Sequence, residues 1–119
     1  MPAPVRRRDD FDALSRSRAR ARSGPLRATR APLPEGDDAD LVRVAYAVPR
    51  AVGTAVVRNR VRRRLRAMTA ELEAAGDLAP GLYLIGAGPG AEAAPAAELR
   101  THLVRALSAL AAASARGRS

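Results

Sequence analysis

Apolar residues follow a helical period through the middle of the chain, between Thr54 and Gly76. They recur at spacings of four, four, three and four residues, at Val57, Val61, Leu65, Met68 and Leu72. At about 100° per residue these positions fall within one stripe roughly 80° wide, so they predict a helix with one buried face. Thr54 is suited to cap the first turn of this helix, and Gly76 is suited to end it.

A second amphipathic helix is predicted near the C-terminus. Its apolar face consists of Leu99, Leu103, Leu107 and Leu110. Pro95 precedes these leucines and is compatible with a first helical turn, where the missing N–H would have no intrahelical partner. The preceding residues 86–95 are mostly small and predict a loop.

The N-terminal part of the chain predicts a thinner helix. Asp9 or Asp10 can cap its first turn by accepting backbone N–H bonds. Phe11 and Leu14 give it a narrow apolar face. Gly24 and the proline that follows it are expected to end the helix.

Three segments carry strand patterns. Residues 41–48 are rich in β-branched side chains, and residues 82–85 are apolar throughout, which predicts a central strand. Residues 26–31 alternate weakly and predict an edge strand, and residues 32–40 predict an acidic hairpin loop. The order helix, strand, strand, helix, strand, helix predicts an α/β (α+β) two-layer sandwich of one small sheet and helices.

The length of 119 residues is sufficient for one domain with a modest core. We expect this domain to span residues 9–111. Residues 1–8 contain two prolines and three arginines and have little to bury, so they predict a flexible basic arm. Residues 112–119 predict a flexible tail.

Composition excludes several classes of protein. The chain has no cysteine and one histidine, which argues against disulfides, thiolate catalysis and a Cys or His metal cluster. No apolar run approaches the about 20 residues that cross a bilayer. The N-terminal arginines are not followed by the apolar stretch of a signal peptide. We therefore expect a cytoplasmic protein with no membrane partner.

Positive charge dominates the chain and is concentrated in two blocks. The formal net charge is +9, which indicates a polyanionic partner. Residues 1–30 hold nine Arg and three Asp, and residues 50–66 hold seven Arg and no acid. The second block includes six arginines within the nine positions from Arg58 to Arg66 of the central helix. The side opposite the apolar stripe carries Arg58, Asn59, Arg62, Arg63 and Arg66.

Such a helix face is unusual for a surface that only contacts solvent. Like charges at i,i+4, as at Arg58, Arg62 and Arg66, repel one another by a few tenths of a kcal/mol. Arginine binds phosphate oxygens through a planar fork of donors, and Asn59 can both donate and accept hydrogen bonds. The face therefore predicts binding to a nucleic-acid backbone.

Other chemistry-bearing positions are less informative. The glycines of residues 86–90 resemble a phosphate-binding loop only superficially, because no Gly-Lys-Ser/Thr follows and Pro89 lacks a donor. Helix capping explains the carboxylates that crowd the first helix, Asp9, Asp10 and Asp12.

Two single residues have open roles. Phe11 is either a core anchor or a stacking platform for an unpaired base. His102 is predicted to lie at the surface. Because no acid–base pair is apparent, we expect neither a protein active site nor a small-molecule substrate.

The sequence around the second arginine block resembles a known signature. From Gly53 it follows the order Gly-x-Ala-Val-x-Arg-Asn-Arg, with a basic residue before it and more basic residues after it. This order resembles the signature of the bacterial ribonuclease P protein subunit. Residues 7–12, Arg-Arg-Asp-Asp-Phe-Asp, resemble the opening helix of the same family.

The resemblance implies both a fold and a role. The fold would be a ribosomal-protein-like sandwich with a left-handed crossover into the Arg-Asn-Arg helix. The protein would join a catalytic ribonuclease P RNA, which holds the Mg²⁺ ions and removes the 5′ leader of precursor tRNA. It would thus be the subunit of an endoribonuclease without an active site of its own, contacting the RNA and guiding the leader through a cleft.

Carried over by position, the resemblance also implies site residues. It assigns RNA binding to the central helix, at Arg58, Asn59, Arg60, Arg62, Arg63, Arg64 and Arg66. It assigns the leader cleft, between the first helix and the sheet, to Phe11, Thr29 and Arg50. Ser15 and Thr29 stand where the family commonly has aromatic residues, so Phe11 is the only aromatic residue expected at the cleft.

Two other functions fit the charge pattern. A structural ribosomal RNA-binding protein or ribosome assembly factor would bind ribosomal RNA and would not restore precursor-tRNA cleavage. A DNA-binding regulator would place the central helix in a major groove. Arginines occupy most of that polar face, however, and few residue types suited to base readout are present.

Overall fold

The computed structural model describes residues 2–117, and the side chains of residues 2–112. Five strands, three helices and one short 3₁₀ turn make up the described chain. In order they are β1 (Ala3–Pro4), α1 (Arg8–Arg16), β2 (Ala19–Ser23), β3 (Leu26–Ala31), β4 (Val42–Ala47), η1 (Arg50–Val52), α2 (Ala55–Ala74), β5 (Gly81–Ala87) and α3 (Ala96–Gly117).

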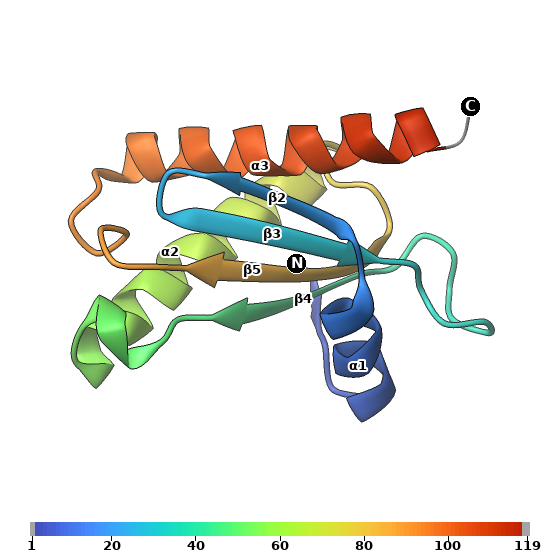
Figure 1. The fold of residues 1–119 in the computed structure, drawn as a ribbon, viewed down its shortest axis with the longest axis horizontal. Coiled ribbons are helices and arrows are strands. Elements are labelled where there is room, and N and C mark those ends of the chain that lie inside the picture. The colour runs from blue at the N-terminus through green and yellow to red at the C-terminus, as the bar shows by residue number, and fades with distance from the viewer. Residues whose placement is uncertain (1, 118–119) are drawn as a thin grey trace.

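The strands form one mixed sheet in the order β1-β4-β5-β3-β2. The apolar strand β5 lies in the middle, parallel to β4 and antiparallel to β3, as its composition predicts. Helices α2 and α3 pack against one face of the sheet, and α1 packs against one end of the other face (Figure 1). The predicted α+β sandwich is confirmed.

The connection from β4 to β5 has an uncommon hand. These two strands are parallel neighbours, so the chain crosses over between them through α2. In Figure 1 both strands run to the left, α2 lies behind the sheet, and β5 lies above β4, which makes the crossover left-handed. About 98% of such connections are right-handed, so this feature distinguishes the fold from most α/β units.

The main core lies between the sheet and the two long helices. It contains the predicted apolar face of α3 and that of α2 from Val61 onward, with Leu65, Leu99 and Leu103 fully buried. Val57, also predicted for this face, is only half-buried. The Thr54 hydroxyl caps α2 by accepting a hydrogen bond from the Val57 N–H at 3.3 Å. Gly76 follows the helix with φ +76°, a conformation that glycine adopts without strain.

A smaller core lies on the opposite face of the sheet. Leu14 of α1 packs there with Val5, Ala31 and Leu82. Because α1 has only nine residues, it covers one end of this face. The remainder of the face stays open, which creates the groove described below.

The first helix is shorter than predicted, and a strand was missed. Helix α1 ends at Arg16, where the prediction extended it to Gly24. Ser17 stops it: its hydroxyl donates to the Arg30 carbonyl and accepts from the Ala19 N–H. Residues 19–23 then alternate small and charged side chains and pair with β3, so β3 is an inner strand and not an edge.

Two further expectations about loops and caps are wrong. Residues 32–40 do not form a hairpin, because β5 lies between β3 and β4 in the sheet. The residue before α1 is Arg7, which makes no side-chain cap, and Asp10 is buried within the helix at 1% exposure. The aspartates therefore do not cap α1 from the preceding position.

Both ends of the described chain contain secondary structure. Ala3 and Pro4 pair with β4, and the Arg43 guanidinium donates to the Pro4 carbonyl at 3.1 Å. Helix α3 continues to Gly117. Residues 118–119 of the expected tail lie outside the described residues. The flexibility of both ends and the domain bounds 9–111 stay predictions.

Candidate nucleic-acid interface

The arginine face of α2 lies opposite the buried stripe of that helix. Val61 and Leu65 are buried on one side, whereas all seven predicted RNA-binding side chains are at least partly exposed. Asn59, Arg60, Arg63 and Arg66 are the most open, and Arg58, Arg62 and Arg64 are half-buried. Within the described chain, no carboxylate forms a salt bridge with these arginines.

Two of these arginines are held in place by neighbours. The Arg62 guanidinium donates to the Asn59 side-chain oxygen at 2.9 Å and to the Val48 carbonyl at 3.5 Å. The Arg66 guanidinium lies 5.7 Å from the centre of the Tyr46 ring, a cation–π distance. The face is thus partly preorganised for a polyanion.

The Tyr46 side chain is itself held by a hydrogen bond to a buried residue. Its hydroxyl hydrogen-bonds the hydroxyl of the buried Thr69 at 2.5 Å, and Thr69 also donates to the Arg66 carbonyl at 3.1 Å. Burial raises the pKa of Tyr46, so the ring stays neutral and its hydroxyl acts as a hydrogen-bonding group. The Tyr46 ring is therefore a rigid support for Arg66.

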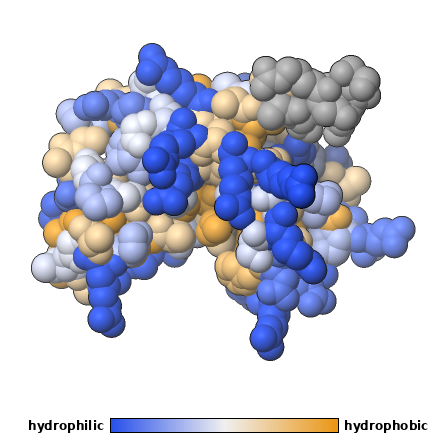
Figure 2. Space-filling view, in the orientation of Figure 1, coloured by the Kyte–Doolittle hydropathy of each residue, from blue (hydrophilic) through white to orange (hydrophobic). Residues whose placement is uncertain are grey.

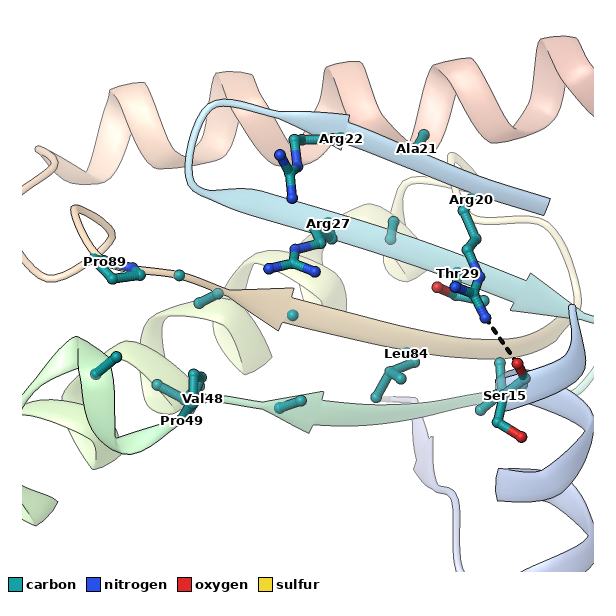
Figure 3. A pocket seen from close by; sticks show the side chains of 17 residues that line it. Ser15, Arg20, Ala21, Arg22, Arg27, Thr29, Val48, Pro49, Leu84 and Pro89 are labelled. Atoms are coloured by element: carbon teal, nitrogen blue, oxygen red, sulfur yellow. Dashed lines mark hydrogen bonds between the residues drawn. The ribbon is translucent and has the colours of Figure 1, made fainter. Parts of the chain in front are cut away.

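A groove of about 850 Å³ lies on the open face of the sheet, between the end of α1, the β2–β3 hairpin and the turn that precedes α2. Figure 2 shows hydrophilic side chains on both sides of a hydrophobic strip on this face. The close-up in Figure 3 shows side chains from β2, β3, β4 and the end of α1 around the groove. The residues that line it are Leu14, Ser15, Arg20, Ala21, Arg22, Arg27, Ala28, Thr29, Ala47, Val48, Pro49, Ala51, Leu84, Gly86, Ala87, Gly88 and Pro89.

The three residues expected at the leader cleft are only partly brought together. Thr29 lines the groove. Phe11 is 43% exposed and lies one helical turn before Leu14 and Ser15, outside the lining, so it is not a core anchor. Arg50 is exposed in the turn whose neighbouring residues line the groove.

Sequence reasoning did not select the arginines that line this groove. They are Arg20, Arg22 and Arg27, on β2 and β3. The alternation of arginine with alanine over residues 18–22 was a strand signal that could have found them. They lie on the face of the sheet opposite α2 and α3, so the fold separates these three arginines from those of α2.

His102 is not a surface residue as predicted. Its side chain is only 19% exposed, and its Nδ1 lies 2.8 Å from the Ser23 hydroxyl. Gly24 packs against the same ring: a Cβ atom there would lie 2.6 Å from it. His102 therefore joins α3 to the tip of the β2–β3 hairpin, which supports one wall of the groove.

Neither a group of metal ligands nor a membrane-spanning helix is found among the described residues. Among them, no three His, Cys, Asp or Glu side chains are grouped as metal ligands would be. Within residues 2–117, no helix combines the length and the apolar character that a membrane span requires.

Comparisons with known proteins identify the family. The family model described as Ribonuclease P matches residues 2–111. This chain belongs to the ribonuclease P protein family. The ribonuclease P protein component of Streptomyces bikiniensis is 39% identical over 113 residues, covering 89% of each chain, and that of Streptomyces avermitilis is equally similar.

Solved structures support the fold of a ribonuclease P protein. A Staphylococcus aureus RNase P protein, a mutant with defective mRNA degradation activity, superposes with a TM-score of 0.77 at 16% identity. The superposition covers 88% of this chain and 85% of that one. The predicted family is thus confirmed, together with its role as the protein component of ribonuclease P in bacterial tRNA 5′ processing.

Proposed function

We propose that the polar face of α2 binds the catalytic RNA of ribonuclease P. The observation that carries this proposal is the row of six arginines from Arg58 to Arg66 without a salt-bridge partner among the described residues. Phosphate oxygens would neutralise these charges and remove their mutual repulsion. Release of counterions from the RNA would make the affinity strongly dependent on salt.

The groove on the other face of the sheet binds the 5′ leader of precursor tRNA. It is open at the surface, and its charged side chains are all basic. Thr29 lies in the groove, and Phe11 and Arg50 flank it. Bound to both RNAs, the protein would raise the affinity of the holoenzyme for precursors over mature tRNA.

The cleavage itself belongs to the RNA subunit in this proposal. Hydrolysis by ribonuclease P needs Mg²⁺, which activates water and stabilises charge on the phosphate. The described part of the chain has no carboxylate cluster that fits this ion, so the ion would be held mainly by the RNA subunit and the substrate. The residues of this chain act by binding and orienting RNA, in the cytoplasm.

Cleavage of a 5′-extended precursor tRNA by a bacterial ribonuclease P RNA at low Mg²⁺ tests the proposal. We expect this chain to restore cleavage at the mature 5′ end. A structural ribosomal RNA-binding protein would bind RNA without this stimulation. Tight RNA binding with no stimulation, also with RNA from the source organism, would contradict the proposal.

A further inference from the structure

Three arginines from two adjacent strands project from the open face of the sheet. The strand register pairs Arg22 directly with Arg27, and Arg20 with Thr29. Figure 3 shows the side chains of Arg22 and Arg27 near the turn end of the hairpin, where Arg22 extends toward β3 and Arg27 toward β5, and Arg20 turned toward α1. We call Arg20, Arg22 and Arg27 the arginine ladder.

The arginine ladder places like charges on neighbouring strands, where they repel one another. Like charges directly opposite each other on neighbouring strands are destabilising. Arg22 and Arg27 are exposed and have no hydrogen-bond or salt-bridge partner within the described part of the chain. The groove lining also contains no carboxylate. A bound polyanion would relieve this repulsion, whereas a neutral or cationic ligand would not.

Arg20 is preorganised at the α1 end of the ladder. Its Nε donates to the Ser17 carbonyl at 2.9 Å, and its Nη2 donates to the Ser15 carbonyl at 2.7 Å. Arg20 and Arg22 are two residues apart on one strand, about 6.6 Å, which resembles the spacing of successive phosphates in an extended nucleic-acid strand. Fixing a side chain before binding reduces the entropy lost on binding.

The groove has no aromatic platform for stacked bases. Proteins that recognise unpaired bases stack them on aromatic side chains. None of the described residues that line this groove is aromatic, and its floor is built from residues such as Leu84 and Gly86. Phe11 is exposed outside the lining. The groove therefore offers charge and apolar surface but no aromatic face.

We propose that the arginine ladder binds the leader of precursor tRNA through its phosphates and not through its bases. This inference rests on the proposed function of the groove. It makes the contribution of the leader to affinity independent of leader sequence and dependent on salt. Three neutralised phosphates correspond to a slope of about 2 in log affinity against log salt, at about 0.7 per phosphate on a single strand.

Chemically altered leaders separate the two kinds of recognition. We would measure the affinity of the holoenzyme, assembled with a bacterial ribonuclease P RNA, for precursor tRNAs with an unmodified, an abasic or a methylphosphonate leader. The abasic leader keeps the phosphates, and the methylphosphonate leader removes their charge. We expect the abasic leader to bind within about twofold of the unmodified one, and the methylphosphonate leader to bind no better than leaderless tRNA.

Two matched double variants test whether the arginine ladder makes the contact with the leader. R22Q/R27Q removes two charges from the ladder, and R6Q/R105Q removes two exposed charges that lie outside the groove lining. We expect R22Q/R27Q to weaken leader-dependent binding about tenfold, at about threefold for each exposed contact, with a shallower salt dependence. R6Q/R105Q should retain the leader contribution.

Two results would overturn the inference. One is an abasic leader that loses its contribution while the methylphosphonate leader keeps it, which would indicate base recognition. The other is an unchanged leader contribution in R22Q/R27Q. Failure of the unmodified protein to assemble with the RNA, measured separately, would instead overturn the proposed function and the inference with it.

Discussion

The two arginine surfaces of this molecule are held in different ways. On α2 the arginines lie along one helix. Arg66 is fixed by the Tyr46 ring of β4, and Arg62 by the carbonyl of Val48, the residue that follows β4. On the hairpin they come from two strands, and Arg22 and Arg27 have no described partner. A rigid helix face suits a folded RNA of defined shape, whereas the exposed side chains of Arg22 and Arg27 suit a single strand of variable sequence.

The position of the arginine face of α2 depends most strongly on the packing of the core beneath that helix. Leu65 is fully buried under the arginine face, so L65A should lower the free energy of unfolding by about 2–5 kcal/mol and weaken RNA binding with it. Urea unfolding measures this change. V56A, at a residue 68% exposed on the same helix, should change stability by less than about 0.5 kcal/mol. Equal effects of the two variants would mean that α2 does not pack as described.

Loss of charge from α2 should affect the catalytic RNA and not the leader. R58A/R60A should weaken assembly with ribonuclease P RNA by about 150-fold, at about 1.5 kcal/mol for each of the two hydrogen-bonded charges. A filter-binding titration over a series of salt concentrations would also give a slope smaller by about 1.4–1.8. Unchanged RNA affinity would remove α2 from the interface.

The support beneath Arg66 can be weakened without changing any charge. Y46F removes the hydrogen bond to the buried Thr69 hydroxyl and keeps the aromatic face. We expect a loss of about 1 kcal/mol in stability with little change in RNA affinity. Y46L should also lower RNA affinity, because Arg66 loses the ring. Thermal unfolding and RNA titration of the two variants, compared side by side, would separate these effects.

Alkaline pH should lower the free energy of unfolding slightly. Burial raises the pKa of Tyr46, beside α2, and of Tyr83, beside Arg30 on β3, above the ordinary value of 10.0. The unfolded chain then loses these protons before the folded chain does. This contribution to stability is complete below about pH 10 and is lost as the pH rises through the raised values. Urea unfolding on both sides of about pH 10 should show the decline, and Y46F/Y83F should reduce it; an identical decline in the variant would contradict this.

The elements with strong local periodicity were predictable from the sequence. The leucines of α3, the Thr54 cap and the apolar strand β5 all lie where their patterns indicate. Those signals depend on neighbours within about one helical turn or one strand. The family signature in α2 has the same local character, which is why the helix surface was found.

The groove was harder to predict because it depends on pairing between distant segments. The alternation over residues 18–22 is a strand signal, but the same arginines also fit a basic helix end. The hydrogen bond from Ser17 to Arg30 and the register with β3 select the strand. His102 was likewise misassigned because its partner, Ser23, lies 79 residues away. Partners so far apart in the sequence do not change the local order of apolar and polar residues, so that order cannot predict them.

The central claim is that the two arginine surfaces bind two different RNAs. The most direct test measures, for R58A/R60A and R22Q/R27Q, both the affinity for ribonuclease P RNA and the ratio of affinities for leader-containing and leaderless tRNA at saturating protein. We predict that R58A/R60A lowers the first quantity and preserves the second, and that R22Q/R27Q does the reverse. If both variants changed the same quantity to the same extent, the division of roles would be wrong.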